Sequence, residues 1–280
     1  MTDTKKITKR KNGVIRGKTD FFRTARYGLT LQEHRIIYYA ILRGQQEGKS
    51  FEPVTLSVAE FKELFEVNGK NYYATIRNLS NKMVGRTVEV IYKDNEGTHL
   101  LQAPWLVGIR YHAKTGTVTI EPNKNLQPFF EGKPFTDTEF AFLIKFTSQY
   151  AERLYELIKT FAYKSIADFE IEDLRQKLAV GKKYPNYNNF KEYALQPAVN
   201  DINEFTDLDI DFREQRGMYN KVDSVVFSIH KKDVPKLAKR IENGEFTPPL
   251  SEEEQAQMIA EMFEGQVSFD DLALEGDTDE

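Results

Sequence analysis

The stretch TLQEHRIIYYAIL (residues 30–42) opens the part of the chain whose pattern decides the fold. Thr30 and Glu33 make a capping-box sequence, in which a hydroxyl and a carboxylate satisfy free backbone N–H groups at a helix start. Apolar residues then recur on one face at helical spacing. The pattern predicts a helix that ends near Gly44, a residue type common at helix C-termini.

The elements predicted after this helix follow the order of a winged helix. A short strand precedes a second capping box, Ser57-Val58-Ala59-Glu60, and a second helix. A turn at Asn68-Gly69 leads to a third helix and a strand pair. The predicted ranges are a strand at 54–56, a helix at 71–83, and strands at 87–92 and 98–111, the last broken by Pro104.

The same order recurs at an offset of about 117 residues. The second set has helices at 148–161 and 172–178, a short strand at 169–171, a third helix with Leu195, Val199 and Ile202 inward, and strands at 208–213 and 222–229. The sequence therefore predicts an α+β fold of two tandem winged-helix domains related by a pseudo-repeat. Pro197 falls inside the third helix, so that helix is either kinked there or starts later.

Charge divides the chain into an arm, two domains and a tail. The predicted parts are a basic flexible arm (1–28), a first winged-helix domain with a connecting segment (29–145), a second winged-helix domain (146–235) and an acidic, mostly disordered tail (236–280). Residues 1–29 hold nine basic and two acidic groups, whereas residues 245–280 hold twelve acids and no Lys or Arg. The net charge of −4 thus does not exclude a polyanionic partner. The arm either follows DNA or only aids solubility, and the tail is either a solubilising segment or includes a short partner-binding helix.

Composition argues against several other classes of protein. The chain has no cysteine, no apolar run long enough to span a membrane and no signal peptide, which fits the bacterial cytoplasm. Its four histidines are too far apart in sequence for the metal-binding element of a rolling-circle nickase. Gly48-Lys49-Ser50 resembles the end of a P-loop, but Arg43 stands where that motif needs glycine. We therefore expect neither enzymatic activity nor a metal or other cofactor.

The third helix of each unit is the segment expected to enter the major groove, where base edges are distinguishable. Asn and Gln can pair bidentately with adenine, and Lys can contact guanine or phosphate. In the second domain the candidates are Asn188, Asn189, Lys191, Glu192, Gln196 and Asn200 on the helix, Lys182, Lys183 and Tyr187 at its start, and Arg213, Arg216 and Lys221 at the wing. In the first they are Lys70, Asn71, Tyr73, Arg77, Asn78, Lys82 and Arg86. The alternative for each is an ordinary solvated surface residue.

Several segments together resemble theta-type plasmid replication initiators, the iteron-binding Rep proteins with two winged-helix domains. They are Leu29-Thr30-Leu31-Gln32-Glu33, Phe146-Thr147-Ser148-Gln149-Tyr150 with Arg153-Leu154-Tyr155-Glu156-Leu157, Tyr187 through Phe190-Lys191, and Leu195-Gln196-Pro197-Ala198-Val199-Asn200-Asp201-Ile202-Asn203. The resemblance covers about residues 25–232. It implies binding of direct repeats at a plasmid origin, with the second domain (146–235) as the main DNA-reading domain, and recruitment of the host initiator and helicase. It also implies dimers that form through the first domain and repress the protein's own gene.

Two other functions fit the same fold. A dimeric winged-helix transcriptional repressor or partition-type DNA binder would prefer an inverted repeat. A protein-interaction scaffold would show no salt-dependent affinity for DNA. The step from fold to replication initiation therefore rests on the resemblance.

Overall fold

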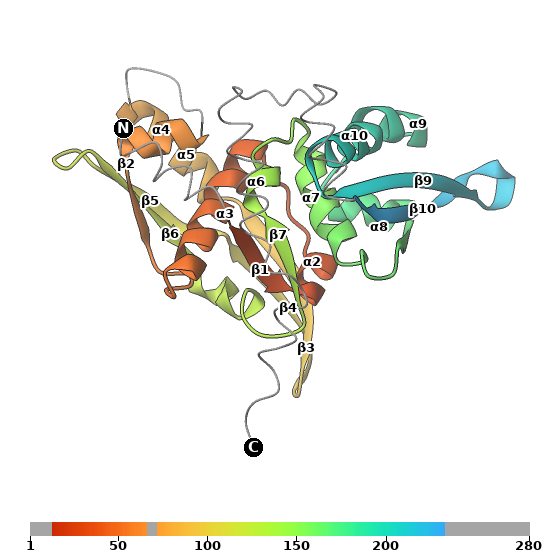
Figure 1. Cartoon of the computed structure of the whole chain (residues 1–280), viewed down its shortest axis with the longest axis horizontal. Coiled ribbons are helices and arrows are strands. Elements are labelled where there is room, and N and C mark those ends of the chain that lie inside the picture. Colours follow the sequence, from red (N-terminus) through yellow and green to blue (C-terminus); the bar gives the residue numbers. More distant parts are fainter. Residues whose placement is uncertain (1–12, 66–71, 233–280) are drawn as a thin grey trace. The chain divides into compact units, whose positions relative to one another are not determined.

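A computed structural model of the chain describes residues 13–65 and 72–232, and its helices and strands follow the predicted order twice (Figure 1). Residues 1–12, the Asn68-Gly69 turn, Lys70, Asn71 and the acidic tail lie outside the described residues, as does the side chain of Tyr73.

The first unit begins with the predicted capping box. The Thr30 N–H donates to the Glu33 carboxylate (2.9 Å) and the Glu33 N–H to the Thr30 hydroxyl (3.3 Å). Ser57 and Glu60 form the second predicted box. The elements are α3 (Leu31–Gln46), β2 (Val54–Ser57), α4 (Val58–Phe65), α5 (Tyr72–Met83), β3 (Thr87–Asp94) and β4 (Gly97–Pro104).

The predicted end of the first helix at Gly44 is wrong, since α3 continues to Gln46. Gly44 is buried within the helix. A Cβ there would lie 2.9 Å from the Lys49 carbonyl oxygen. Glycine is required because the returning chain passes close to the helix, not because the helix ends.

Pro104 separates two sheets. The predicted strand over residues 98–111 divides into β4, which pairs only with β3, and β5 (Leu106–His112), which joins the three-stranded sheet β2-β6-β5. The segment expected to connect the domains contains β6 (Thr117–Pro122), η1 (Lys124–Phe129), β7 (Phe135–Glu139) and α6 (Phe140–Leu143). Trp105, at the break, is buried against Phe21 and Tyr27.

The predicted flexible arm is wrong for residues 13–28. They form β1 (Val14–Lys18), which pairs antiparallel with β7, and α2 (Thr19–Thr24). Phe21 and Phe22 are fully buried, and burial of side chains this large contributes about 1.5–3 kcal/mol each. Two of the basic residues here have partners within the fold: Arg16 pairs with Asp137 (2.9 Å), and Arg23 donates to the Thr160 carbonyl oxygen (2.8 Å).

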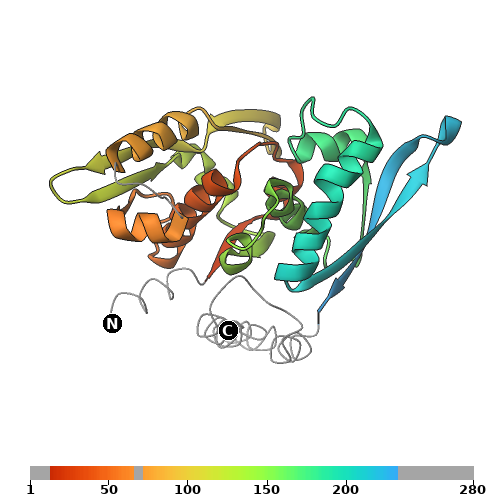
Figure 2. The same cartoon turned by 90° about the horizontal axis from the view of Figure 1, so that it is seen from above.

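The second unit repeats the winged-helix order around the sheet β8-β10-β9. Its elements are α7 (Gln149–Lys159), β8 (Ile166–Glu170), α8 (Ile171–Lys177), α9 (Tyr187–Phe190), the π-helical turn η2 (Lys191–Leu195), α10 (Gln196–Phe205), β9 (Leu208–Arg216), η3 (Met218–Asn220) and β10 (Val222–Lys231). The hairpin β9–β10 extends beyond the helices of this unit in both views (Figures 1 and 2).

Pro197 is accommodated by a change of helix type. The backbone stays helical from α9 through η2 into α10, and Pro197 lies in the first turn of α10. The wide turn of η2 precedes the proline, which cannot donate the N–H that an uninterrupted α-helix would need there. The predicted third helix therefore exists, but as two α-helical segments joined by a π turn.

Helix α7 contacts both units. Its N-terminus is held to α10 by Asp201, which accepts hydrogen bonds from the N–H groups of Thr147 and Ser148 (2.7 Å each). Another face of α7 packs against α2 and carries residues that bond to His34 on α3. The two winged-helix units are therefore joined through a buried helix.

Candidate nucleic-acid interface

The third helix of the second unit carries two rows of side chains, one polar and one apolar. In each row the residues are four positions apart in the sequence. The inward line, Phe190, Ala194, Ala198 and Ile202, is fully buried, and the predicted inward residues Leu195 and Val199 are also buried. The outward line is exposed and consists of Asn188, Glu192, Gln196 and Asn200. The Gln196 side-chain amide donates to the Asn200 side-chain oxygen (3.0 Å). We call this outward row the reading line. Its side chains carry groups that can form hydrogen bonds to base edges.

Lys191 and Tyr187 lie beside the wing instead of on the reading line. The Lys191 ammonium is 2.8 Å from one carboxylate oxygen of Glu214, and Arg216 is 2.7 Å from the other. Burial is the main cause that raises the pKa of Tyr187, and the negative charge of Glu214 raises it further. The Lys191 hydrogen bond is the main cause that lowers the pKa of Glu214. Three predicted DNA-contact residues therefore converge on one carboxylate.

Glu214 was not among the predicted site residues. On β9, Leu208 and Ile210 face the helices, and Glu214 continues this two-residue alternation. An acid on the helix-facing side of a strand was the signal in the sequence that could have found it.

The loop between α8 and α9 is fixed by Arg175. Its guanidinium donates to the carbonyl oxygens of Lys183 (2.9 Å) and Tyr184 (2.8 Å). Lys182 and Lys183 are exposed on this loop, as predicted for residues that contact phosphate. At the wing, Arg213, Arg216 and Lys221 are also exposed.

The first unit has fewer free basic groups than predicted. Arg77 and Lys82 on α5 are exposed. Arg86, by contrast, lies 3.0 Å from Glu33, the acid of the capping box. Arg86 and Lys183, which belong to different units, line one cavity of about 270 Å³.

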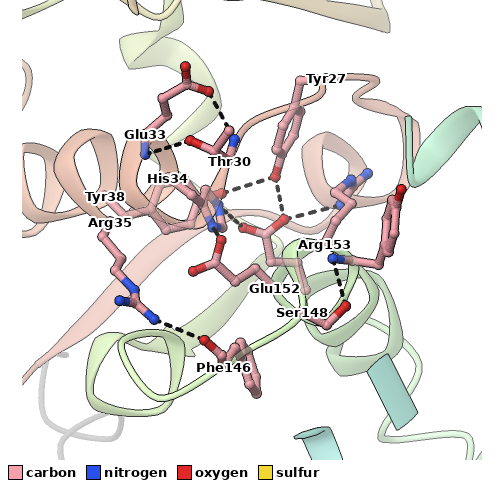
Figure 3. A network of polar contacts seen from close by, with 12 residues as sticks. Tyr27, Thr30, Glu33, His34, Arg35, Tyr38, Phe146, Ser148, Glu152 and Arg153 are labelled. Atoms are coloured by element: carbon pink, nitrogen blue, oxygen red, sulfur yellow. Dashed lines mark hydrogen bonds and ion pairs between the residues drawn. The ribbon is translucent and has the colours of Figure 1, made fainter. Parts of the chain in front are cut away.

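A buried network of charged and hydroxyl groups links α3 to α7 beside this cavity (Figure 3). It consists of Tyr27, His34, Glu152, Arg153 and Glu156, all of which are buried. The His34 ring nitrogens lie 2.6 Å from Glu152 and 3.1 Å from Glu156. Arg153 lies 3.3 Å from Glu156, which also accepts from the Tyr27 hydroxyl. Four charges of balanced sign thus lie between the helices.

The pKa values of the two buried acids, Glu152 and Glu156, are shifted in opposite directions. Burial disfavours charge on His34, but Glu152 and Glu156 outweigh it and raise the pKa of His34 to about 10. Burial also raises the pKa of Glu152, one of whose oxygens has no hydrogen-bond partner. For Glu156, His34 and Arg153 outweigh burial and lower the pKa. Glu156, which contacts His34, Arg153 and the Tyr27 hydroxyl, is therefore the main anion of the network.

The raised pKa of His34 makes stability depend on pH. Its contribution is complete below the ordinary pKa of 6.5 and is lost as pH rises toward the folded-state pKa of about 10. We expect the free energy of unfolding to fall by about 1.5 kcal/mol between pH 6.5 and pH 8 in urea titrations. Above that window Lys145 opposes the trend, since burial lowers its pKa to about 8.

His34→Gln is the control for this dependence. The variant should lack the loss between those two pH values. An equal loss in both proteins would contradict the assignment to His34.

Residues 13–65 and 72–232 contain neither a metal-ligand cluster nor a membrane-spanning helix. No group of three or more His, Cys, Asp or Glu side chains there is placed to hold a metal ion. Within the same ranges, no helix is both long and apolar enough to cross a membrane.

Two protein-family models match most of the folded chain. The model described as "Initiator Replication protein, WH1" matches residues 15–159, and "Initiator Rep protein, WH2" matches residues 170–229. The chain belongs to this family of replication initiators. The predicted pair of winged-helix domains is thereby confirmed, and all second-unit DNA-contact candidates fall within WH2. The WH1 match includes α7, which the sequence placed at the start of the second domain.

Solved structures similar to this initiator include the Pi initiator protein in complex with iteron DNA. The two share 17% identity and a TM-score of 0.57, over 79% of this chain and 98% of that one. At this identity the likeness concerns the fold. A second match is the WH1 domain of MSBI1.176, a replication protein isolated from a multiple sclerosis patient, with 24% identity, a TM-score of 0.30 and coverage of 36% and 80%.

The Glu214 contacts predict that this acid restrains DNA affinity. Glu214→Gln removes a negative charge between Lys191 and Arg216 and frees both cations for phosphate. Binding to duplexes of any sequence should tighten. The salt slope, which is the slope of log affinity against log salt concentration, should steepen by about one for each cation that gains a phosphate contact. Titrations at two salt concentrations measure this.

Glu96→Gln, in the exposed turn between β3 and β4, is the matched loss of charge in the other winged-helix unit. It should leave the slope unchanged. Glu214→Gln binding no better than the parent would show that Lys191 and Arg216 do not contact phosphate.

Proposed function

We propose that this initiator starts plasmid replication by binding direct repeats at the origin, with WH2 making the base contacts. The reading line carries this proposal, because four exposed polar side chains at four-residue spacing fit the base edges of the major groove. The Pi initiator protein, similar in fold, forms a complex with iteron DNA, which supports repeated sites as the target.

Phosphate contacts would fix the register of that helix. Lys182 and Lys183 lie on a loop held by Arg175 just before α9, and Arg213 and Lys221 are exposed on the wing. Arg77 and Lys82 of WH1 would add a second region of contact. Such contacts raise affinity for any sequence and make it depend on salt.

The proposed mode of action is binding and recruitment rather than catalysis. Bound to its repeats in the bacterial cytoplasm, the protein would recruit the host initiator and helicase, as its resemblance to iteron-binding initiators implies. Self-association would use WH1. Ile91 and Leu100 are exposed cross-strand neighbours on the β3–β4 hairpin, an apolar pair that a second copy could cover.

The test is a titration of the protein on the DNA that flanks its own gene, scanned for short direct repeats, at about 50 and 200 mM salt. Stepwise saturation with one protein per repeat supports the proposal. Binding only as a dimer to an inverted repeat would favour a repressor. Absence of salt-dependent binding would favour a protein-interaction scaffold.

A further inference from the structure

The tip of the WH2 wing exposes two large apolar side chains between basic residues. Met218 is 80% exposed and Tyr219 is 100% exposed. Arg216 precedes them and Lys221 follows, and both are exposed. Isolated exposed apolar residues are common, but adjacent ones at a hairpin tip, with Arg216 before them and Lys221 after them, combine an apolar contact surface with charges that attract phosphate.

The turn that carries these side chains is well defined and strained. The Gly217 N–H donates to the Lys221 carbonyl oxygen (2.9 Å), and Arg216 donates across the turn to the Asn220 carbonyl oxygen (3.1 Å). Tyr219 and Asn220 have φ of 58° and 59°. Asn adopts this left-handed region readily, whereas for Tyr219 it costs about 1–2 kcal/mol. Burial of the Tyr219 ring does not offset this cost, and strain without compensating packing is characteristic of functional sites.

The wing is held beside the third helix of WH2. The Lys191–Glu214 ion pair joins η2 of that helix to β9, and Glu214 lies three residues before the turn that begins at Gly217. At about 3.3 Å per residue, the tip lies about 10 Å farther along the hairpin. Both views show the tip beyond the helices of this unit (Figures 1 and 2).

We propose that, with α10 in the major groove, the wing tip reaches the flanking minor groove, where Met218 and Tyr219 form a wedge that partly unstacks a base step. This rests on the proposed function, since it requires α10 to lie in the adjacent major groove. Arg213, Arg216 and Lys221 would bind the phosphates on either side. Apolar side chains inserted between base steps kink DNA in many minor-groove proteins, and pyrimidine–purine steps yield most easily.

The test uses the full chain and its direct repeat with 2-aminopurine placed in turn at each adenine in and beside the repeat. The fluorescence of this base rises when it unstacks. The parent protein should raise it several-fold at one step beside the repeat. Met218→Ala with Tyr219→Ala should abolish the rise yet weaken binding by less than about tenfold, because removal of the wedge also removes the cost of unstacking.

Two single variants serve as controls. Tyr219→Phe keeps the ring and should keep the fluorescence rise. Tyr163→Ala removes a tyrosine that is 71% exposed in the turn after α7, and should also leave the rise intact. Repeat binding with no rise at any position, or an undiminished rise with the double variant, would overturn the wedge alone. Absence of salt-dependent binding would overturn the proposed function and the wedge together.

Discussion

Glu156→Gln should lower the free energy of unfolding by about 3–5 kcal/mol, because it leaves buried cations without their main anion. Glu156 lies 3.1 Å from His34 and 3.3 Å from Arg153, and it also accepts from the Tyr27 hydroxyl. All of these side chains are buried, so water cannot take the place of the carboxylate. Urea unfolding at pH 7 measures the loss.

Glu152→Gln is the matched control. Glu152 bonds to the same histidine, but its second oxygen has no partner and burial raises its pKa. Its loss should cost less, about 1–2 kcal/mol, because less favourable interaction is removed. Equal costs at the two positions would show that Glu156 is not the main anion.

A double variant tests whether these residues act as one network. Once Glu156 is neutral, the network holds two buried cations, His34 and Arg153, and one acid, Glu152, so removal of the His34 charge relieves an excess of buried positive charge. His34→Gln combined with Glu156→Gln should therefore cost less than the sum of the two single changes. Strict additivity would mean that the two side chains contribute independently.

The features predicted well from sequence are those set by neighbouring residues. A capping box needs two residues three positions apart, and helical spacing needs one turn, so the starts of α3 and α4 could be read directly. The reading line follows from the same periodicity. Gly44 shows the limit, because its role comes from the approach of Lys49, which only the folded chain brings close.

The fold of residues 13–28 was missed for a related reason. The basic residues dominated the pattern, but β1 pairs with β7, more than one hundred residues away. No local signal marks such a partner. Phe21 and Phe22 were the available hint, since adjacent large aromatics are seldom left in solvent.

The ion pairs at the candidate site were also hidden from the sequence. Lys191 and Arg86 have the right residue type for DNA contact, yet each is paired with an acid of another element, Glu214 and Glu33. Outward direction can be predicted from helical spacing. Whether a cation is free depends on what the rest of the fold places beside it.

Gln196→Ala should weaken binding to the cognate repeat by about 5- to 150-fold while leaving other sequences unaffected. Gln196 is exposed on the reading line near the start of α10, and an amide there can bond bidentately to adenine. Because the side chain is exposed, stability should change by no more than about 0.5 kcal/mol. Titration on the repeat and on a scrambled duplex separates the two affinities.

Asn200 orients the side chain of Gln196. The Gln196 amide donates to the Asn200 side-chain oxygen (3.0 Å), which holds it before DNA arrives. Asn200→Ala should therefore weaken repeat binding, and the two losses should be less than additive when combined. Lys182→Ala is the contrasting variant: loss of a phosphate contact should weaken binding to all duplexes alike and reduce the salt slope by about one. If Gln196→Ala weakens all duplexes equally, α10 does not read bases and the reading line is a solvated surface.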